Sequence, residues 1–270
     1  MSETDKVFAG SIPENYDRYL VPLIFESFAQ NIAQRVAALS PRTILETAAG
    51  SGVVTRALTP RLSPDASYVV TDLNQPMIDY AATQQVADRR VRWRKADAQA
   101  LPFEDAAFDV VCCQFGVMFF PDRQSGYREA KRVLKPGGCF CFNVWDRIEE
   151  NVFANDVTNA LAEVFPSDPP RFLARTPHGY HDIALIRSEL EKAGFSRVVI
   201  ETKAEQSRAS SPRQPAVAYC QGTPLRNEIE ARDADKLQVA TDYAASQIAN
   251  KHGSGEVAAK IQAHIIVASV

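Results

Sequence analysis

The sequence lacks several patterns that mark other classes of protein. Its 270 residues carry 30 lysines and arginines against 33 aspartates and glutamates, a formal charge of −3. No dense basic cluster stands out, so nucleic acid is not the expected partner. The basic stretch "VRWRKAD" at 91–97 is interpreted as a strand edge or a loop rather than an RNA-binding patch. No run approaches the about 20 apolar residues of a membrane span, and no signal-peptide core opens the sequence.

Metal-binding spacing is lacking as well. The five cysteines are Cys112, Cys113, Cys139, Cys141 and Cys220. None forms a C-x-x-C pair and no histidine ladder accompanies them, so no metal site is predicted. An odd number of thiols, four of them on apolar strand-like segments, predicts reduced side chains in a core. With no leader pattern, the expected location is the cytoplasm.

Strand-like and helix-like segments alternate from about residue 43 to residue 145. Apolar runs such as "TILET", "YVVTD" and "DVVCCQF" are separated by segments with helical periodicity. Continuous apolar strands covered by helices predict a doubly wound, mostly parallel α/β sheet. The rhythm then loosens: a further strand is predicted at 196–202, mostly helix at 212–253, and a last strand within "IQAHIIVASV".

The stretch "ILETAAGSGVVTRAL" at 44–58 runs from a strand through small residues into a helix. Gly50 and Gly52 let the backbone approach a ligand closely, and the start of the helix offers free N–H groups. This pattern suits a pyrophosphate, a phosphate or a cationic cofactor. A dinucleotide-binding fingerprint would need a third small residue at the position of Thr55. Glu46 would also repel a pyrophosphate, whereas it suits an ammonium or sulfonium group.

Two further acids follow the next two strands. Asp72 ends the second strand about 20 residues beyond the small cluster, where doubly wound sheets place an acid on ribose hydroxyls. Asp97 follows the third strand, where it could accept a hydrogen bond from an adenine amino group. Each acid alone could be a helix cap or a turn residue. Together with Glu46, they place three acids at successive strand ends and favour a nucleoside cofactor.

These residues resemble the class I S-adenosylmethionine-dependent methyltransferases of the small-molecule type, related to ubiquinone and menaquinone methyltransferases. The likeness covers 41–145 and rests on "LETAAGSG", "VVTDLN", "KADAQALPFEDAAFDVV", "CQFGVMFFPD" and "EAKRVLKPGG" in that order. Ala48 departs from the family, which often has glycine there. The resemblance implies a Rossmann-like, seven-stranded sheet with an antiparallel last strand and helical cap elements. It implies one domain, 1–270, with a cofactor-binding core at 41–145 and substrate-cap elements at 1–40, 146–180 and 205–255.

The resemblance also implies a set of cofactor contacts. Glu46 would orient the methionyl end, and Asp72 would bind the ribose. Leu73 would pack on the adenine face, Asp97 would meet the adenine amino group, and Gln114 would lie beside the sulfonium. All residues implied to bind the cofactor are Tyr16, Tyr19, Glu46, Ala48, Gly50, Gly52, Asp72, Leu73, Asp97, Ala98, Gln114 and Phe115.

Some of these residues have a second interpretation. Phe115 could be core packing beneath a loop. Tyr16 and Tyr19 stand in the N-terminal segment "ENYDRYLVPLIF" and share a face if it is α-helical. They either contact the sulfonium or hold this segment to the cap.

The expected activity is methyl transfer from S-adenosylmethionine to a small, partly apolar acceptor. The main tasks of such a protein are to hold the acceptor in line with the methyl group and to exclude water. His178 and His181 in "TPHGYHD" are candidate bases, with a surface or capping role as the alternative. Other hypotheses are a cofactor-binding protein without turnover and an NAD(P)-dependent oxidoreductase. The expected state is a monomer or a homodimer.

Overall fold

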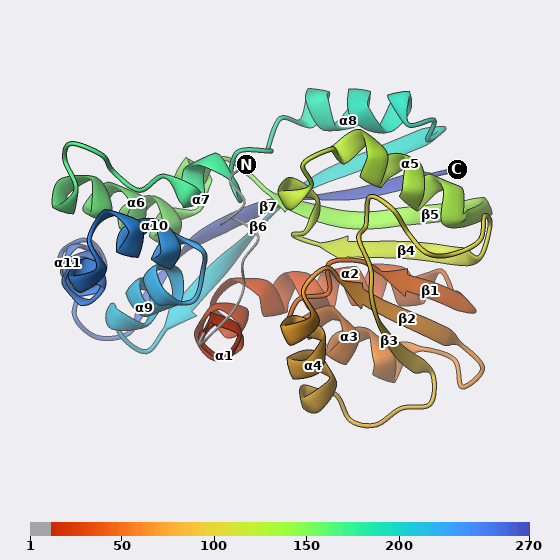
Figure 1. Ribbon diagram of the computed structural model, residues 1–270, viewed down its shortest axis with the longest axis horizontal. Coiled ribbons are helices and arrows are strands. Elements are labelled where there is room, and N and C mark those ends of the chain that lie inside the picture. Colours follow the sequence, from red (N-terminus) through yellow and green to blue (C-terminus); the bar gives the residue numbers. More distant parts are fainter. Residues whose placement is uncertain (1–11) are drawn as a thin grey trace. The chain divides into compact units, whose positions relative to one another are not determined.

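The computed structural model describes residues 12–270. Within this range seven strands form one sheet in the order β3-β2-β1-β4-β5-β7-β6 (Figure 1). From the central pair β1 and β4, the chain moves outward to β2 and β3 on one side and to β5 on the other. A sheet with this order changes direction between β1 and β4, where ligands bind at the carboxyl ends of the strands. The strands are β1 (Thr43–Glu46), β2 (Ser67–Asp72), β3 (Val91–Lys95), β4 (Phe108–Gln114), β5 (Leu134–Trp145), β6 (Arg197–Ala209) and β7 (Val257–Ser269).

Most neighbouring strands are parallel. β1 pairs in parallel with β2 and β4, β2 with β3, and β4 with β5. The last strand, β7, runs antiparallel between β5 and β6 (Figure 1). The predicted doubly wound, seven-stranded sheet with an antiparallel last strand is therefore confirmed.

The described chain falls into two compact units. We call residues 26–144, 181–203 and 263–270 the sheet unit, and residues 12–25, 145–180 and 204–262 the helical unit. The bounds of the helical unit are close to those predicted for the cap segments 146–180 and 205–255. Residues 26–40 were also predicted to be cap, but they belong to the sheet unit. Residues 1–11, also predicted to be cap, lie outside the described residues. The extent of the domain stays a prediction.

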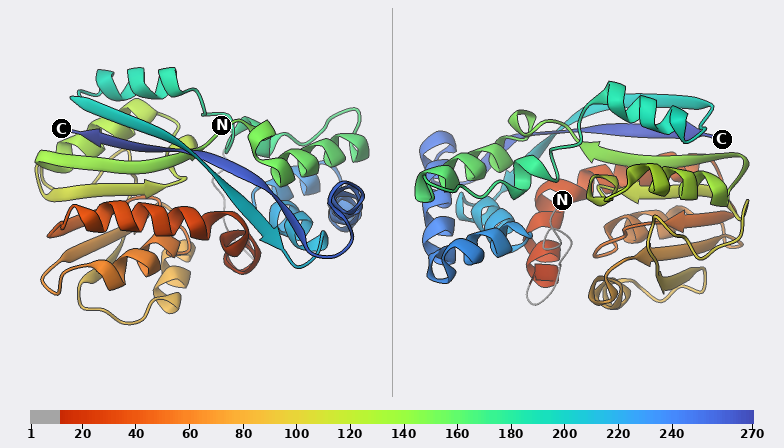
Figure 2. Two further views of the ribbon diagram at one scale, coloured as in Figure 1. Left: turned by 180° about the vertical axis from the view of Figure 1, so that it is seen from behind. Right: turned by 45° about the horizontal axis from the view of Figure 1, so that its top comes forward.

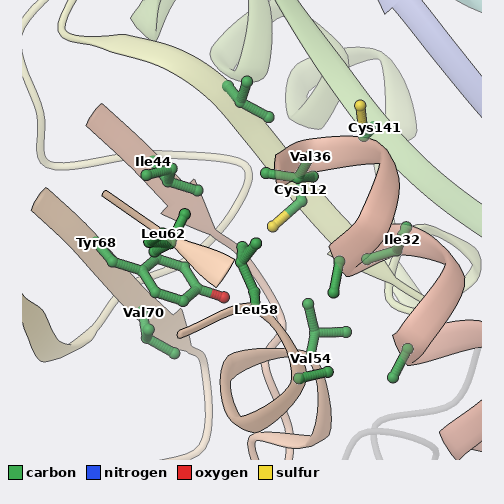
Figure 3. Close-up of a cluster of buried hydrophobic side chains, with 14 of the residues drawn as sticks. Ile32, Val36, Ile44, Val54, Leu58, Leu62, Tyr68, Val70, Cys112 and Cys141 are labelled. Carbon is green, nitrogen blue, oxygen red and sulfur yellow. The ribbon is translucent and has the colours of Figure 1, made fainter. Parts of the chain in front are cut away.

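In the sheet unit, helices cover both faces of the sheet (Figure 2). On one face, α2 and α3 pack on β1, β2, β4 and β5; Figure 3 shows Leu58 of α3 beside Tyr68, and Val36 of α2 beside Cys112. On the other face, Tyr127 of α5 contacts the rings of two phenylalanines of β5. The helices are α2 (Glu26–Ala38), α3 (Val53–Leu58), α4 (Gln75–Gln84), α5 (Arg123–Val133) and α8 (Ile183–Lys192).

β5 is apolar on both faces because helices cover it on both sides. Cys139 and Cys141 belong to the cluster under α2, whereas the rings of Phe140 and Phe142 contact Tyr127 of α5. Side chains alternate between the two faces of a strand, so a strand covered on both faces needs apolar residues throughout. All five cysteines are free and buried, as a core role predicts.

The helical unit consists mainly of helices. The predicted sixth strand is longer than expected, because β6 continues to Ala209 before the helices begin. The segment with Tyr16 and Tyr19 is a π-helix, η2, not an α-helix. The helices are α1 (Ile12–Asn15), η2 (Tyr16–Phe25), α6 (Val152–Val164), α7 (Phe172–Arg175), α9 (Arg213–Gln221), α10 (Leu225–Arg232) and α11 (Leu237–His252).

Two observations bound the chemistry of residues 12–270. No helix in this range is both long and apolar enough to cross a lipid bilayer. No group of three or more histidine, cysteine, aspartate or glutamate side chains in the same range is arranged to hold a metal ion.

Candidate cofactor site

β1 ends in a turn that requires left-handed backbone. Ala48, Gly50 and Gly52 have φ values of 52°, 57° and 81°. Glycine adopts this conformation freely, whereas in alanine it costs about 1–2 kcal/mol. Strained backbone of this kind persists where surrounding contacts impose it, and it concentrates at functional sites.

Asp72, at the end of β2, holds this turn. Its Oδ2 accepts a hydrogen bond from the Gly50 backbone N–H at 2.9 Å, and its Oδ1 accepts one from the Asn74 backbone N–H at 2.8 Å. Burial raises the pKa of Asp72, and these N–H donors oppose the rise. A carboxylate has about four acceptor positions, so these two bonds leave lone pairs for a ligand. The same side chain can therefore fix the turn and accept hydrogen bonds from ribose hydroxyls.

Glu46 supports the turn from inside the protein. Its Oε2 accepts hydrogen bonds from the Thr55 hydroxyl, at 2.7 Å, and from the Tyr68 hydroxyl. Glu46 is only 1% exposed, and burial is the main reason that its pKa rises to about 7. The carboxyl group thus ties α3 and β2 to the end of β1. Its predicted role toward the methionyl end stays a prediction.

A second left-handed turn follows β4. Phe115 has a φ of 50°, and its backbone N–H donates to the side-chain oxygen of Asn143 at 2.9 Å. The next residue, Gly116, has no room for a side chain: an added Cβ would lie 2.5 Å from Cβ of Ala48 and 2.6 Å from Sγ of Cys113. The turns after β1 and β4 are therefore packed directly against each other.

The two residues before Gly116 take different positions. Gln114 is half-buried at the end of β4, paired with Asn143 of β5. Phe115 is buried, and its ring meets Phe28 of α2 edge to face at 5.5 Å between centroids. The core interpretation of Phe115 accounts for its ring contacts, and proximity of either residue to a sulfonium stays a prediction.

The expected adenine residues follow β2 and β3, which are adjacent strands. Leu73 is 43% exposed, unusual for leucine, and offers an apolar surface directly after Asp72. Asp97 and Ala98 are half-buried. Oδ1 of Asp97 accepts hydrogen bonds from the backbone and side-chain N–H groups of Gln99, at 2.9 and 3.2 Å. An exposed apolar side chain near a carboxylate suits a flat base with an amino group.

Two buried polar atoms, one in the first turn and one in β5 beside the second turn, lack a hydrogen-bond partner within residues 12–270. They are Oγ of Ser51 and Nδ2 of Asn143, whose residues are 1% and 0% exposed. An unsatisfied buried polar group costs about 1–3 kcal/mol, so native structures usually supply a partner. A cofactor with carboxylate and hydroxyl oxygens offers partners of the required kind, so the residues present fit S-adenosylmethionine.

The two tyrosines belong to the helical unit. The ring of Tyr16 stacks on Phe25 at 5.1 Å, and the guanidinium of Arg18 lies 5.1 Å from the ring centroid of Tyr19. The argument that both tyrosines share a face assumed an α-helix; the wider turn of a π-helix moves residues three apart away from a common face. Contact of either ring with the cofactor stays a prediction.

The two histidines have separate surroundings. His178 lies buried in the helical unit, with Nδ1 2.9 Å from the backbone oxygen of Asp146 and its ring 5.9 Å from that of Trp145. His181 lies half-buried in the sheet unit, directly before Asp182, which caps α8. A catalytic role for either histidine stays a prediction.

Three residues that shape the site were missed in the sequence. Asn74 follows Asp72 by two positions, a spacing typical of an Asx turn that could have been recognised. Asn143 interrupts the apolar run "CFCFNVW", and a polar residue in a strand buried on both faces is itself a signal. Gly116 gave no signal, because its need for glycine depends on Ala48, which is remote in sequence.

Comparison with known proteins identifies the family. A family profile described as "Methyltransferase domain" matches residues 45–142. A "Ubiquinone/menaquinone biosynthesis C-methyltransferase" of Burkholderia mallei is 30% identical over 165 residues, which cover 57% of this chain and 68% of that protein. The chain belongs to the class I S-adenosylmethionine-dependent methyltransferase family. The segment that the family profile matches contains both left-handed turns.

Other curated relatives are more distant or match a shorter segment. An Idiomarina loihiensis protein with the same description is 28% identical over 179 residues, covering 57% of this chain and 66% of the relative. A "Demethylmenaquinone methyltransferase" of Deinococcus radiodurans is 36% identical over 133 residues, covering 48% and 55%. The chain thus spans just under two thirds of the first of these relatives and about half of the second.

Solved structures confirm the fold of this methyltransferase-family chain. The YcgJ protein of Bacillus subtilis has a TM-score of 0.56 at 17% identity, covering 90% of this chain and 98% of that chain. A SAM-dependent methyltransferase of Aquifex aeolicus has a TM-score of 0.51 at 18% identity, covering 70% and 90%. At this identity the likeness shows the fold and does not extend to the acceptor.

Proposed function

We propose that this protein transfers the methyl group of S-adenosylmethionine to a ring carbon of a small, partly apolar acceptor of the quinol class. The observation that carries the proposal is the left-handed turn after β1, which Asp72 holds through the Gly50 N–H. Family membership supports the cofactor. The names of the relatives, which describe C-methyltransferases of ubiquinone and menaquinone biosynthesis, support the acceptor class.

The proposed binding follows from the contacts in the sheet unit. S-adenosylmethionine supplies a methyl group on a positively charged sulfur. Asp72 would accept hydrogen bonds from the ribose while keeping those from Gly50 and Asn74. Asp97 would accept one from the adenine amino group, and the Ser51 hydroxyl would bond to an oxygen of the cofactor. The protein's task is then to orient the acceptor and exclude water.

The residue at the third fingerprint position disfavours a dinucleotide. There Thr55 carries a hydroxyl that donates to Glu46 at 2.7 Å, whereas dinucleotide-binding turns use a small residue for close helix–strand packing. A cofactor-binding protein without turnover remains the competing hypothesis. It predicts affinity for the cofactor and no methylated product.

Methyl-labelled S-adenosylmethionine tests the proposal. The protein is incubated with the labelled cofactor and demethylmenaquinol, with the oxidised quinone as control, and products are measured by mass spectrometry. We expect one labelled methyl group on the quinol and none on the quinone, because only the reduced ring carbon is electron-rich enough to attack. If a compound in a wider metabolite extract were methylated and the quinol were not, the acceptor would belong to another chemical class.

Binding measurements separate the remaining hypotheses. Calorimetry with S-adenosylhomocysteine should show binding, and no heat at millimolar ligand would end the methyltransferase proposal. If the protein binds the cofactor but methylates no acceptor, the hypothesis of a cofactor-binding protein without turnover is supported. Tight binding of NADH would support the oxidoreductase hypothesis. Sedimentation would decide between the expected monomer and homodimer.

A further inference from the structure

Arg132 of α5 holds the segment that joins β3 to β4, which passes beside α5 (Figure 1). Nη1 donates to the backbone oxygen of Phe103 at 2.8 Å and to Oδ1 of Asp105 at 2.7 Å. Nη2 donates to the backbone oxygen of Leu101 at 2.9 Å and to Glu129 at 2.8 Å, and Nε donates to Glu129 at 2.8 Å. A guanidinium has five N–H donors, and here each has its own acceptor.

Glu129 also holds this segment. Its Oε2 accepts a hydrogen bond from the Leu101 backbone N–H at 2.7 Å. The backbone of Leu101 is thus held at its N–H by Glu129 and at its carbonyl by Arg132. The pairing with Arg132 lowers the pKa of Glu129 and raises that of Arg132. Because the pair also satisfies backbone groups, it differs from an isolated surface ion pair, which contributes little.

The start of the same helix holds the start of the segment. Oε1 of Gln99 accepts a hydrogen bond from the backbone N–H of Asp122, the residue that caps α5, at 2.8 Å. The backbone and side-chain N–H groups of Gln99 both donate to Oδ1 of Asp97. Asp97 is therefore linked to α5 through Gln99, and Leu101, four residues further along the segment, is held by the same helix. Both bonds from Gln99 use Oδ1, which leaves Oδ2 for a ligand.

We propose that Arg132 is a positioning residue that sets the selectivity of Asp97 for the 6-amino group of adenine. The inference rests on the proposed cofactor binding. An amino group donates a hydrogen bond to a carboxylate, whereas the oxygen at the same position of hypoxanthine repels it. This selectivity requires that Oδ2 be held in position before the ligand arrives. Only the planar fork of arginine reaches two carbonyls and two carboxylates at once, so lysine cannot replace it.

The test compares two ligands by calorimetry: S-adenosylhomocysteine and S-inosylhomocysteine, its 6-oxo analogue. The wild-type protein should bind the adenine ligand at least about tenfold more tightly, because one hydrogen bond to a charged group is lost and a repulsion is gained. In Arg132→Lys this ratio should fall to about threefold or less, chiefly through weaker binding of the adenine ligand.

Arg90→Lys is a matched control. Arg90, in the same unit, donates to the backbone oxygens of Thr59, Leu62 and Ser63 and to Asp88, so its replacement also removes a guanidinium that holds several carbonyls. This variant should lose thermal stability comparably while keeping the wild-type ligand ratio. Glu129→Gln, which keeps an oxygen for the Leu101 N–H, should lower the ratio as Arg132→Lys does and carries the test if that variant does not fold.

The outcomes separate the inference from the function on which it rests. If Arg132→Lys or Glu129→Gln binds both ligands with the wild-type ratio, the inference is overturned. If the wild-type protein binds both ligands equally tightly, Asp97 does not select the 6-amino group, and the inference is overturned. If the wild type binds neither ligand, the proposed function has failed first.

Discussion

Buried polar residues of the sheet unit and of the helical unit include side chains with different tasks. In the sheet unit, Asp72 and Asn143 bond to backbone groups of turns at the strand ends. In the helical unit, the buried Asp156 of α6 binds Lys251 and His252 at the end of α11, at 2.6 and 2.8 Å. Asp72 and Asn143 thus hold loops that can face a ligand, whereas Asp156 joins two helices. Changes to Asp72, Asn143 and the turns that they hold should therefore alter cofactor affinity or turn stability, whereas changes at the Asp156 contact should not.

The largest expected effect is on the pH dependence of stability, tested by Glu46→Gln. Burial raises the pKa of Glu46 from 4.5 to about 7, so the folded state holds this proton more tightly than the unfolded state. The stability that this provides is full below pH 4.5 and is lost as the pH rises through 7, by about 3 kcal/mol. Glutamine resembles the protonated form and should remove this loss.

Denaturant unfolding at pH 4.5 and pH 8 measures the difference. The exposed Glu104→Gln serves as control and should keep the wild-type slope. Equal pH dependence in wild type and Glu46→Gln would show that the Glu46 carboxyl is not the group that titrates.

Gly116→Ala tests the contact between the two turns. The new methyl group would overlap Cβ of Ala48 and Sγ of Cys113, and overpacking of this kind costs about 2–3 kcal/mol. Adding Ala48→Gly should restore part of the stability, because it removes one of the two overlaps and the left-handed strain. Gly255→Ala in the helical unit, where an added Cβ meets nothing within 4 Å, should stay within about 0.5 kcal/mol of wild type. Thermal or denaturant unfolding measures these differences. Equal stability of Gly116→Ala and Gly255→Ala would contradict the close contact between the two turns.

Asp72→Ala should weaken binding of S-adenosylhomocysteine by about 1–3 kcal/mol, since a charged hydrogen-bond partner is lost. Calorimetry measures this as roughly a 5- to 150-fold rise in Kd. Asp65→Ala, at an exposed aspartate of the same unit, should leave the Kd unchanged. If Asp72→Ala also left it unchanged, Asp72 would serve only to hold Gly50 and Asn74.

The smallest effect is expected for His178→Ala and His181→Ala, which should leave the affinity for S-adenosylhomocysteine within about twofold, because neither belongs to the turns that fit the cofactor. Calorimetry with the cofactor product checks the affinity, and product formation checks turnover. A large loss of affinity in His178→Ala would break the division between the two units, and unchanged turnover in both variants would end the proposal of a histidine base.

The strand-end acids and the glycine turn could be predicted because each depends on a short segment and on the rule that ligands bind at the carboxyl ends of parallel strands. The contacts that hold them could not. Asn143 meets Phe115 across 28 positions, and Arg132 meets Leu101 across 31. Such contacts arise from packing, which periodicity does not encode. The π-helix at Tyr16 could not be predicted either, because local sequence preferences favour the α-helix.

The contact between Ala48 and Gly116 also constrains how this sequence can diverge. Glycine at position 48 would remove one of the two atoms that crowd a side chain at position 116; the other is Sγ of Cys113. Here the order of substitutions matters: alanine at position 116 costs less once position 48 has become glycine, although Sγ of Cys113 still crowds it. We therefore expect these two positions to covary across the family, as an epistatic pair that joins two loops far apart in the gene.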